Sequence, residues 1–192
     1  MKNMARNELL CKICIIDTNL FDDSTYNSCY GEYANRHDLH KKMIDWIRKE
    51  MIEYKLSGIK IPLIIMGHYP PYFYKSAKKV NGCLKMEGMI DLIDLIYDFE
   101  NPVMYFSADA HNYQHLQIKN LEIIIAGTGG ASLDEFKNLP EESIMPVYEA
   151  GSGELTEDKI KINSLVCNYG WIDCEIDFTK NKIKHKFNEL SS

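Results

Sequence analysis

The chain has 192 residues, of which 45% are hydrophobic and 26% are charged, and this is the length and composition of one globular domain with a hydrophobic core. Its formal net charge is -6 and its basic residues are scattered apart from Lys75, Lys78 and Lys79, so the charge argues against a nucleic-acid partner. No apolar run approaches the ~18 residues that cross a bilayer, and Lys12 interrupts the apolar stretch near the start, so neither a membrane span nor a secretory signal is expected.

The first half of the chain alternates between strand patterns and helix patterns. Residues 8–19 (ELLCKICIIDTN) are predicted to form a buried strand that ends near Asp17. Residues 35–56 carry apolar side chains three and four positions apart, which predicts an amphipathic helix with its N-cap at residue 35. A continuous apolar strand over residues 61–67 and a second helix over residues 84–99 are expected to follow.

The second half is expected to complete one sheet. A third strand is predicted over residues 102–108, and a hairpin-like pair over residues 115–127. Residues 131–163 lack periodicity and contain Pro, Gly and acidic residues, so we expect a long irregular insertion there, before two final strands around a turn near Thr179. The order β-α-β-α-β followed by antiparallel strands predicts that residues 1–192 form a single α/β domain with a mixed sheet.

Candidate ligands follow three of the expected strands. Asp17 follows the first strand, His68 the second, and Asp109 and His111 the third. Because the carboxyl ends of parallel strands meet at one edge of a sheet, these loops are expected to lie together. Imidazole and carboxylate groups suit Zn, Fe and Mn, so His68, Asp109 and His111 are candidate metal ligands. A lone histidine after a strand is more often an ordinary loop residue, so the convergence of the loops carries this prediction.

Two further features are candidates for contacts with phosphate. The GTGG segment offers backbone N–H groups at Gly127 and Gly129 to an anion, although a plain turn is the simpler interpretation. Lys78 and Asn81 lie in the segment after the second strand and are candidate phosphate contacts, with a solvated loop face as the alternative.

Three sequence blocks together resemble the second half of a calcineurin-like metallophosphoesterase, and they are most similar to the purple acid phosphatase branch. The blocks are, in chain order, IIMGHYPP, VMYFSADAHNYQHLQI and EIIIAGTGG. The resemblance implies an α-β-β-α sandwich, of which this chain would be a half or degenerate form. It also implies a two-metal site for the hydrolysis of phosphate monoesters, with His68 and His111 as ligands and Asp109 in place of a third histidine.

The motifs that this family carries in its first half do not occur in the chain. No Asp-x-His follows the first expected strand, and neither a Gly-Asp nor a Gly-Asn-His is present. Without the bridging carboxylate of Gly-Asp, two cations ~3.5–4 Å apart would repel each other with little to offset the repulsion. The resemblance therefore implies a phosphatase that is incomplete on its own, with a partner chain that supplies the missing half or with self-association.

Two alternatives remain open at this point. The first is a catalytically inactive, phosphatase-like structural or interaction protein. The second is a small mononuclear hydrolase in which His68, Asp109 and His111 hold one Fe, Zn or Mn ion and leave one position open.

Overall fold

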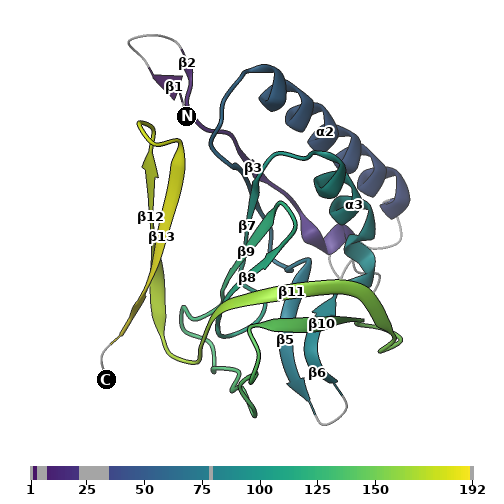
Figure 1. Ribbon diagram of the computed structural model, residues 1–192. Helices are drawn as coiled ribbons and strands as arrows, with labels where there is room; N and C mark the ends of the chain where they lie inside the picture. The colour runs from purple at the N-terminus through teal and green to yellow at the C-terminus, as the bar shows by residue number, and fades with distance from the viewer. Residues whose placement is uncertain (1, 4–7, 22–34, 78–79, 191–192) are drawn as a thin grey trace.

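A computed structural model describes residues 2–3, 8–21, 35–77 and 80–190 (Figure 1). The strands of its main sheet are β3 (Ile13–Ile15), β4 (Leu63–Met66), β5 (Tyr72–Ala77), β6 (Val80–Lys85), β7 (Val103–Ser107), β8 (Tyr113–Ile118), β9 (Leu121–Ala126), β10 (Ile144–Glu149) and β11 (Leu155–Val166). They form one sheet in the order β3-β4-β7-β9-β8-β11-β10-β6-β5. Parallel and antiparallel pairs both occur, so the expected α/β class with a mixed sheet is confirmed.

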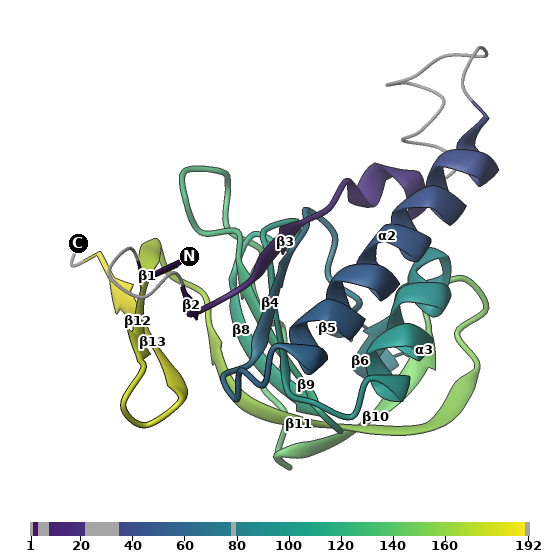
Figure 2. The same cartoon turned by 90° about the horizontal axis from the view of Figure 1, so that it is seen from above.

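Two helices lie on one side of this sheet. They are α2 (Arg36–Leu56) and α3 (Ile90–Asp98), preceded by the 3-10 turns η1 (Thr18–Phe21) and η2 (Glu87–Met89). A hairpin of β12 (Gly170–Asp177) and β13 (Lys182–Glu189) lies on the opposite side (Figures 1 and 2). A short pair of β1 (Lys2–Asn3) and β2 (Glu8–Leu9) stands apart from the main sheet. No helix in the described ranges is both long enough and apolar enough to span a membrane.

The parallel half of the sheet follows directly from its sequence. Strands β3, β4, β7 and β9 pair in parallel, and the apolar residues on their helix-facing side are buried. Helix α2 begins at the predicted N-cap, because the Asn35 side chain accepts a hydrogen bond of 3.3 Å from the backbone N–H of Asp38. These four strands carry the loops in which the candidate ligands lie.

The antiparallel half curls back toward the helices. Figure 2 shows β11 as a long bent strand that runs from beside β8 around toward α3. The curl brings the edge strand β5 against β8, where the buried Gln114 side chain bonds both backbone groups of Tyr74. The Tyr74 N–H donates to Gln114 Oε1 at 2.7 Å, and Gln114 Nε2 donates to the Tyr74 carbonyl at 3.2 Å. One side chain thus satisfies both backbone groups of Tyr74 on the edge of β5.

The expected irregular insertion over residues 131–163 is only partly correct. Strands β10 and β11 occupy residues 144–149 and 155–166, whereas residues 131–143 and 150–154 contain neither strand nor helix. Pro146 in β10 obscured the pattern, and it lies where the pairing with β11 shifts register, as prolines in strands usually do. In β11 the half-buried positions begin with Thr156 and Asp158, so the alternation is not hydrophobic until Ile160.

Two other element boundaries differ from expectation. The strand expected over residues 8–19 is limited to β2 and β3, and the chain then turns into η1. The segment after the second strand, expected to be a loop, contains the antiparallel pair β5–β6, which takes the first residues that we assigned to the second helix. Strands β12 and β13 flank a turn at residues 178–181, as the sequence predicted.

Candidate functional site

The loops that leave the parallel strands meet at one rim of the sheet, as predicted. The Thr18 hydroxyl after β3 accepts hydrogen bonds from the backbone N–H groups of His68 and Tyr69, at 3.1 and 3.0 Å. The His68 carbonyl after β4 in turn accepts from the N–H groups of Ala108 and Asp109, at 3.2 and 3.1 Å. The loops after β3, β4 and β7 are therefore bonded to one another through their backbones.

Two of the three predicted ligands lie side by side at this rim. His68 Nε2 is 3.6 Å from Asp109 Oδ1, and the two side chains are 59% and 41% exposed. Two zinc ligands about 2.1 Å from the ion at a tetrahedral angle lie about 3.4 Å apart, so this spacing suits two ligands of one ion. Both groups are open to solvent, which leaves room for an ion and its water.

His111, the third predicted ligand, is held by the segment after β9. Its Nδ1 lies 3.0 Å from the carbonyl oxygen of Ser132, and its backbone N–H donates to Asp134 Oδ2 at 3.0 Å. A carbonyl oxygen only accepts hydrogen bonds, so Nδ1 carries the proton and Nε2 has the free lone pair. This is the tautomer in which a histidine binds a metal through Nε2.

The electrostatic surroundings of Asp109 link the three side chains. Burial raises the pKa of Asp109, the nearby imidazoles of His68 and His111 lower it, and the neighbouring carboxylate of Asp134 raises it. Asp134 is thus a fourth rim residue, which the sequence did not indicate because it lies in the segment without periodicity. A raised pKa means that protons compete with a cation for Asp109 at low pH.

The four predicted phosphate contacts do not lie together in one exposed group among the described residues. The Gly127 N–H already donates to the Asn112 carbonyl at 3.3 Å, so it is not free for an anion. Gly129 is exposed beside it. The backbone of Asn81 lies in β6, at the end of the sheet far in strand order from the rim, and Lys78 lies outside the described residues.

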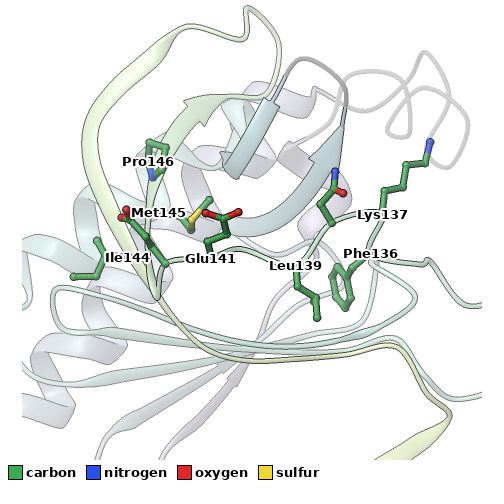
Figure 3. A pocket seen from close by; sticks show the side chains of 9 residues that line it. Phe136, Lys137, Leu139, Glu141, Ile144, Met145 and Pro146 are labelled. Carbon is green, nitrogen blue, oxygen red and sulfur yellow. The ribbon is translucent and has the colours of Figure 1, made fainter.

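A surface pocket of about 780 Å³ has none of the three predicted ligands in its lining (Figure 3). Its lining comes from the segment that leads into β10 and from β10 itself: Phe136, Lys137, Asn138, Leu139, Glu141, Glu142, Ile144, Met145 and Pro146. Two of these residues are glutamates against a single lysine, so the pocket is poorly suited to a phosphate group.

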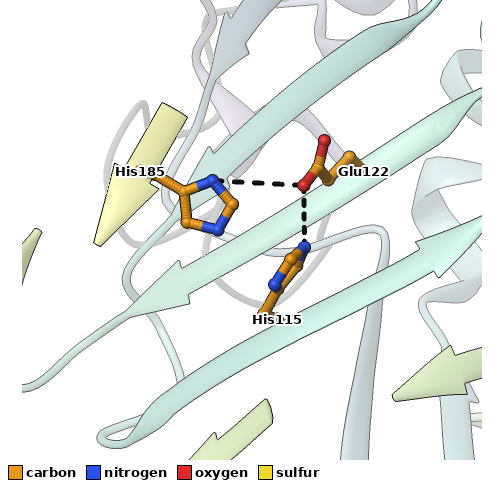
Figure 4. A group of neighbouring side chains, drawn as sticks. All are labelled: His115, Glu122 and His185. Atoms are coloured by element: carbon orange, nitrogen blue, oxygen red, sulfur yellow. Dashed lines mark hydrogen bonds and ion pairs between the residues drawn. The ribbon is translucent and has the colours of Figure 1, made fainter. Parts of the chain in front are cut away.

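A second group of histidine and acidic side chains lies where hairpin β12–β13 meets the sheet. His115 of β8, Glu122 of β9 and His185 of β13 point toward one another, and their ligand atoms all lie within 4.8 Å (Figure 4). His115 Nε2 is 2.7 Å from Glu122 Oε1, and His185 Nδ1 is 4.0 Å from the same oxygen. We call these three residues the hairpin cluster.

The sequence allowed two of the three residues of the hairpin cluster to be placed together. In the predicted hairpin over residues 115–127, Gln117 pairs with Glu122, which places His115 and Glu122 on one face as diagonal neighbours. Nothing in the spacing along the chain indicates that His185 of a separate hairpin covers that face.

The hairpin cluster predicts how stability depends on pH. Burial lowers the pKa of His185 below its ordinary value of about 6.5. The unfolded chain therefore binds a proton at this histidine more readily than the folded protein does. Stability is therefore present above about pH 6.5 and falls as the pH falls below it. Burial lowers the pKa of His40 in the same direction. The free energy of unfolding of the wild type, measured with urea, is expected to be lower at pH 5.5 than at pH 7.5. The difference between the two pH values is expected to be smaller in His185→Gln. An equal difference in the two proteins would contradict a role of His185 in this pH dependence.

Comparison with known proteins identifies a structural relative. No protein-family model matches the chain, and no curated protein sequence matches it. A solved structure described as "GAP50 the anchor in the inner membrane complex of Plasmodium" is 16% identical to the chain with a TM-score of 0.57. The match covers 92% of this chain and 44% of that one, so the chain spans less than half the length of its structural relative. At this identity the likeness concerns the fold.

Proposed function

We propose that the chain is a metallophosphoesterase-like domain that carries half of a phosphate-ester hydrolase site and is incomplete alone. The observation that carries the proposal is the placement of His68, Asp109 and His111 on backbone-linked loops at one rim, with His68 and Asp109 3.6 Å apart. The resemblance of the sequence blocks to the purple acid phosphatase branch supports the same assignment.

The fold supports this proposal at the level of architecture. In an α-β-β-α sandwich a second sheet covers the side of the first sheet that faces away from the helices. Here β12–β13 takes part of that position (Figure 2), and Ile13 and Ile15 on the edge strand β3 mark a part that the described residues leave exposed. The open part is where the missing half would pack.

The rim residues have distinct roles under this proposal. His68 Nε2, Asp109 Oδ1 and the free Nε2 of His111 would hold an Fe, Zn or Mn ion, and such an ion lowers the pKa of water and polarises a phosphate ester. Asp109 is shorter and harder than histidine, so the site favours harder ions than a three-histidine site would. The Ser132 carbonyl fixes the orientation of the His111 ring.

The test is reconstitution of activity. The chain alone is expected to hydrolyse an aryl phosphate no faster than buffer with metal. Mixed with a first-half polypeptide that carries the three missing motifs, it is expected to show metal-dependent hydrolysis that falls at least about 100-fold in His111→Ala, because a ligand is lost. His37→Ala, an exposed histidine at the start of α2, is the matched control.

The second candidate function is a catalytically inactive interaction module. It is favoured by Ile13 and Ile15, which are 42% and 76% exposed on an edge strand, where an unpaired backbone readily adds a partner strand. The structural relative is itself described as an anchor. No hydrolysis in the reconstituted mixture, together with a rim that retains no metal, would favour this function over the first.

A further inference from the structure

The hairpin cluster lies where two layers of the molecule are joined. Phe187 of β13 stacks on Tyr113 of β8 with ring centroids 4.4 Å apart and planes at 11°. The Thr128 hydroxyl donates to the Gly170 carbonyl at 3.0 Å where β12 begins. Strands β12 and β13 form a two-stranded sheet of their own, so side-chain contacts such as these attach the hairpin to the rest of the molecule.

The donor atoms of the cluster are those that bind zinc-class ions. Two imidazoles and one carboxylate form a common three-ligand set for Zn²⁺ and related divalent ions, with a fourth position left for water. The two histidine rings are edge to face, with centroids 4.5 Å apart, and their side chains are only 18% and 11% exposed. An ion bound here would be partly shielded from solvent.

The distances need only small changes to accommodate an ion. Zinc ligands about 2.1 Å from the metal lie about 3.4 Å apart. The contact between His115 and Glu122 is 2.7 Å and would open, whereas the contact between His185 and Glu122 is 4.0 Å and would close. Both of these changes are smaller than about 1 Å, and all three ligand atoms already lie within 4.8 Å of one another, which is within reach of side-chain rotation on fixed strands.

The contact between His115 and Glu122 sets one requirement for an ion. An ionised carboxylate only accepts hydrogen bonds, so His115 Nε2 donates to Glu122 Oε1 at 2.7 Å. An ion can bind at Nε2 once this proton has moved to Nδ1 or to solvent, as metal binding to a histidine requires. Cys174 pairs directly opposite His185 in the hairpin register, so its side chain lies on the same face of the hairpin.

We propose that His115, Glu122 and His185 bind one zinc-class divalent ion, and that this ion fastens hairpin β12–β13 to the main sheet. The site uses none of the rim residues and stands independently of the proposed hydrolase function. The ion would join β8 and β9 to a strand about sixty residues further along the chain, so its main effect is on how firmly the hairpin is docked.

The experiment uses the full chain, stripped with a chelator and titrated with Zn²⁺ at pH 7.5 by calorimetry. One ion is expected to bind at the hairpin cluster, in a step that His185→Ala and Glu122→Gln each weaken at least about 100-fold and that is separate from any binding at the rim. His68→Ala is expected to leave this binding unchanged, which separates the site from the rim. At a Zn²⁺ concentration 100 times the dissociation constant, the unfolding midpoint of the wild type should rise by about 5 °C or more.

Two further readouts guard against a variant that simply unfolds. Co²⁺ in place of Zn²⁺ should give the visible absorption of a low-coordinate site, lost in His185→Ala while the circular dichroism of the sheet is retained. Hydrogen exchange at the β12 and β13 amides should slow when Zn²⁺ is added. The proposal would be overturned if both cluster substitutions left Zn²⁺ binding unchanged, or if Zn²⁺ did not change the rate of hydrogen exchange in the hairpin. His115 and Glu122 would then form a His–Glu pair without a metal.

Discussion

Replacement of Gln114 by leucine is expected to lower the free energy of unfolding by about 3–5 kcal/mol. Leucine has nearly the same volume but cannot bond the N–H and the carbonyl of Tyr74, and both of these backbone groups are buried. Each buried group without a partner costs about 1–3 kcal/mol. The amide also donates to Asn112 Oδ1 at 2.9 Å, which would lose this donor as well. Urea unfolding followed by circular dichroism measures the loss.

The same strand supplies a matched control for this substitution. Gln117 of β8 is exposed, and Gln117→Leu is expected to change stability by no more than about 0.5 kcal/mol. If the two variants differ by less than about 1 kcal/mol, the bridge between Gln114 and β5 does not hold the curled half of the sheet in place.

The position of Gln114 illustrates what the sequence does not reveal. The hairpin that contains it was predicted, and the alternation in β8 places Gln114 on the same side as the buried Leu116. A glutamine among apolar neighbours gives no indication of its partner, which lies forty residues earlier in β5. Since the pair β5–β6 was itself expected to be a loop, the curl that brings β5 to β8 could not be foreseen.

The elements that were predicted correctly are those with strong local signals. Helix α2 has a regular apolar period and an asparagine cap, and β4, β7 and β9 are continuous apolar runs. Strands β10 and β11 were missed because a proline lies in one and polar residues occupy the half-buried positions of the other. Their stability comes from pairing with β6 and β8. Such tertiary contacts do not produce a periodic pattern of apolar residues in the sequence.

The rim was predictable for a topological reason, and the hairpin cluster was not. Parallel strands joined by helices must place their following loops on one edge, so His68 and Asp109 meet whatever the details of the intervening chain. A C-terminal hairpin has no such constraint, because either of its faces can pack on either side of a sheet. His185 faces Glu122 because Phe187 and Tyr113 stack beside them. The orientation of the hairpin is therefore set by side-chain packing and not by topology.

Replacement of Gly127 by alanine is the second change with a large expected effect, a loss of about 2–4 kcal/mol. A Cβ atom at this position would overlap the carbonyl oxygen of Ala110 and lie 2.5 Å from that of Ala108, both in the loop that carries Asp109. These are backbone atoms, so they cannot move aside as a flexible side chain would. Forced overpacking of this kind costs about 1–3 kcal/mol, and more where the backbone must shift.

The neighbouring Gly129 separates this steric effect from a general cost of adding a methyl group to the turn. Nothing lies within 4 Å of a Cβ at Gly129, so Gly129→Ala is expected to be neutral to within about 0.5 kcal/mol. In Gly127→Ala the displaced loop should also expose the amides of Ala108 and Asp109, which donate to the His68 carbonyl, to faster hydrogen exchange. Unchanged exchange at these amides in a destabilised Gly127→Ala would mean that the methyl group is absorbed elsewhere and that the rim is not built on this close approach of the loops after β7 and β9.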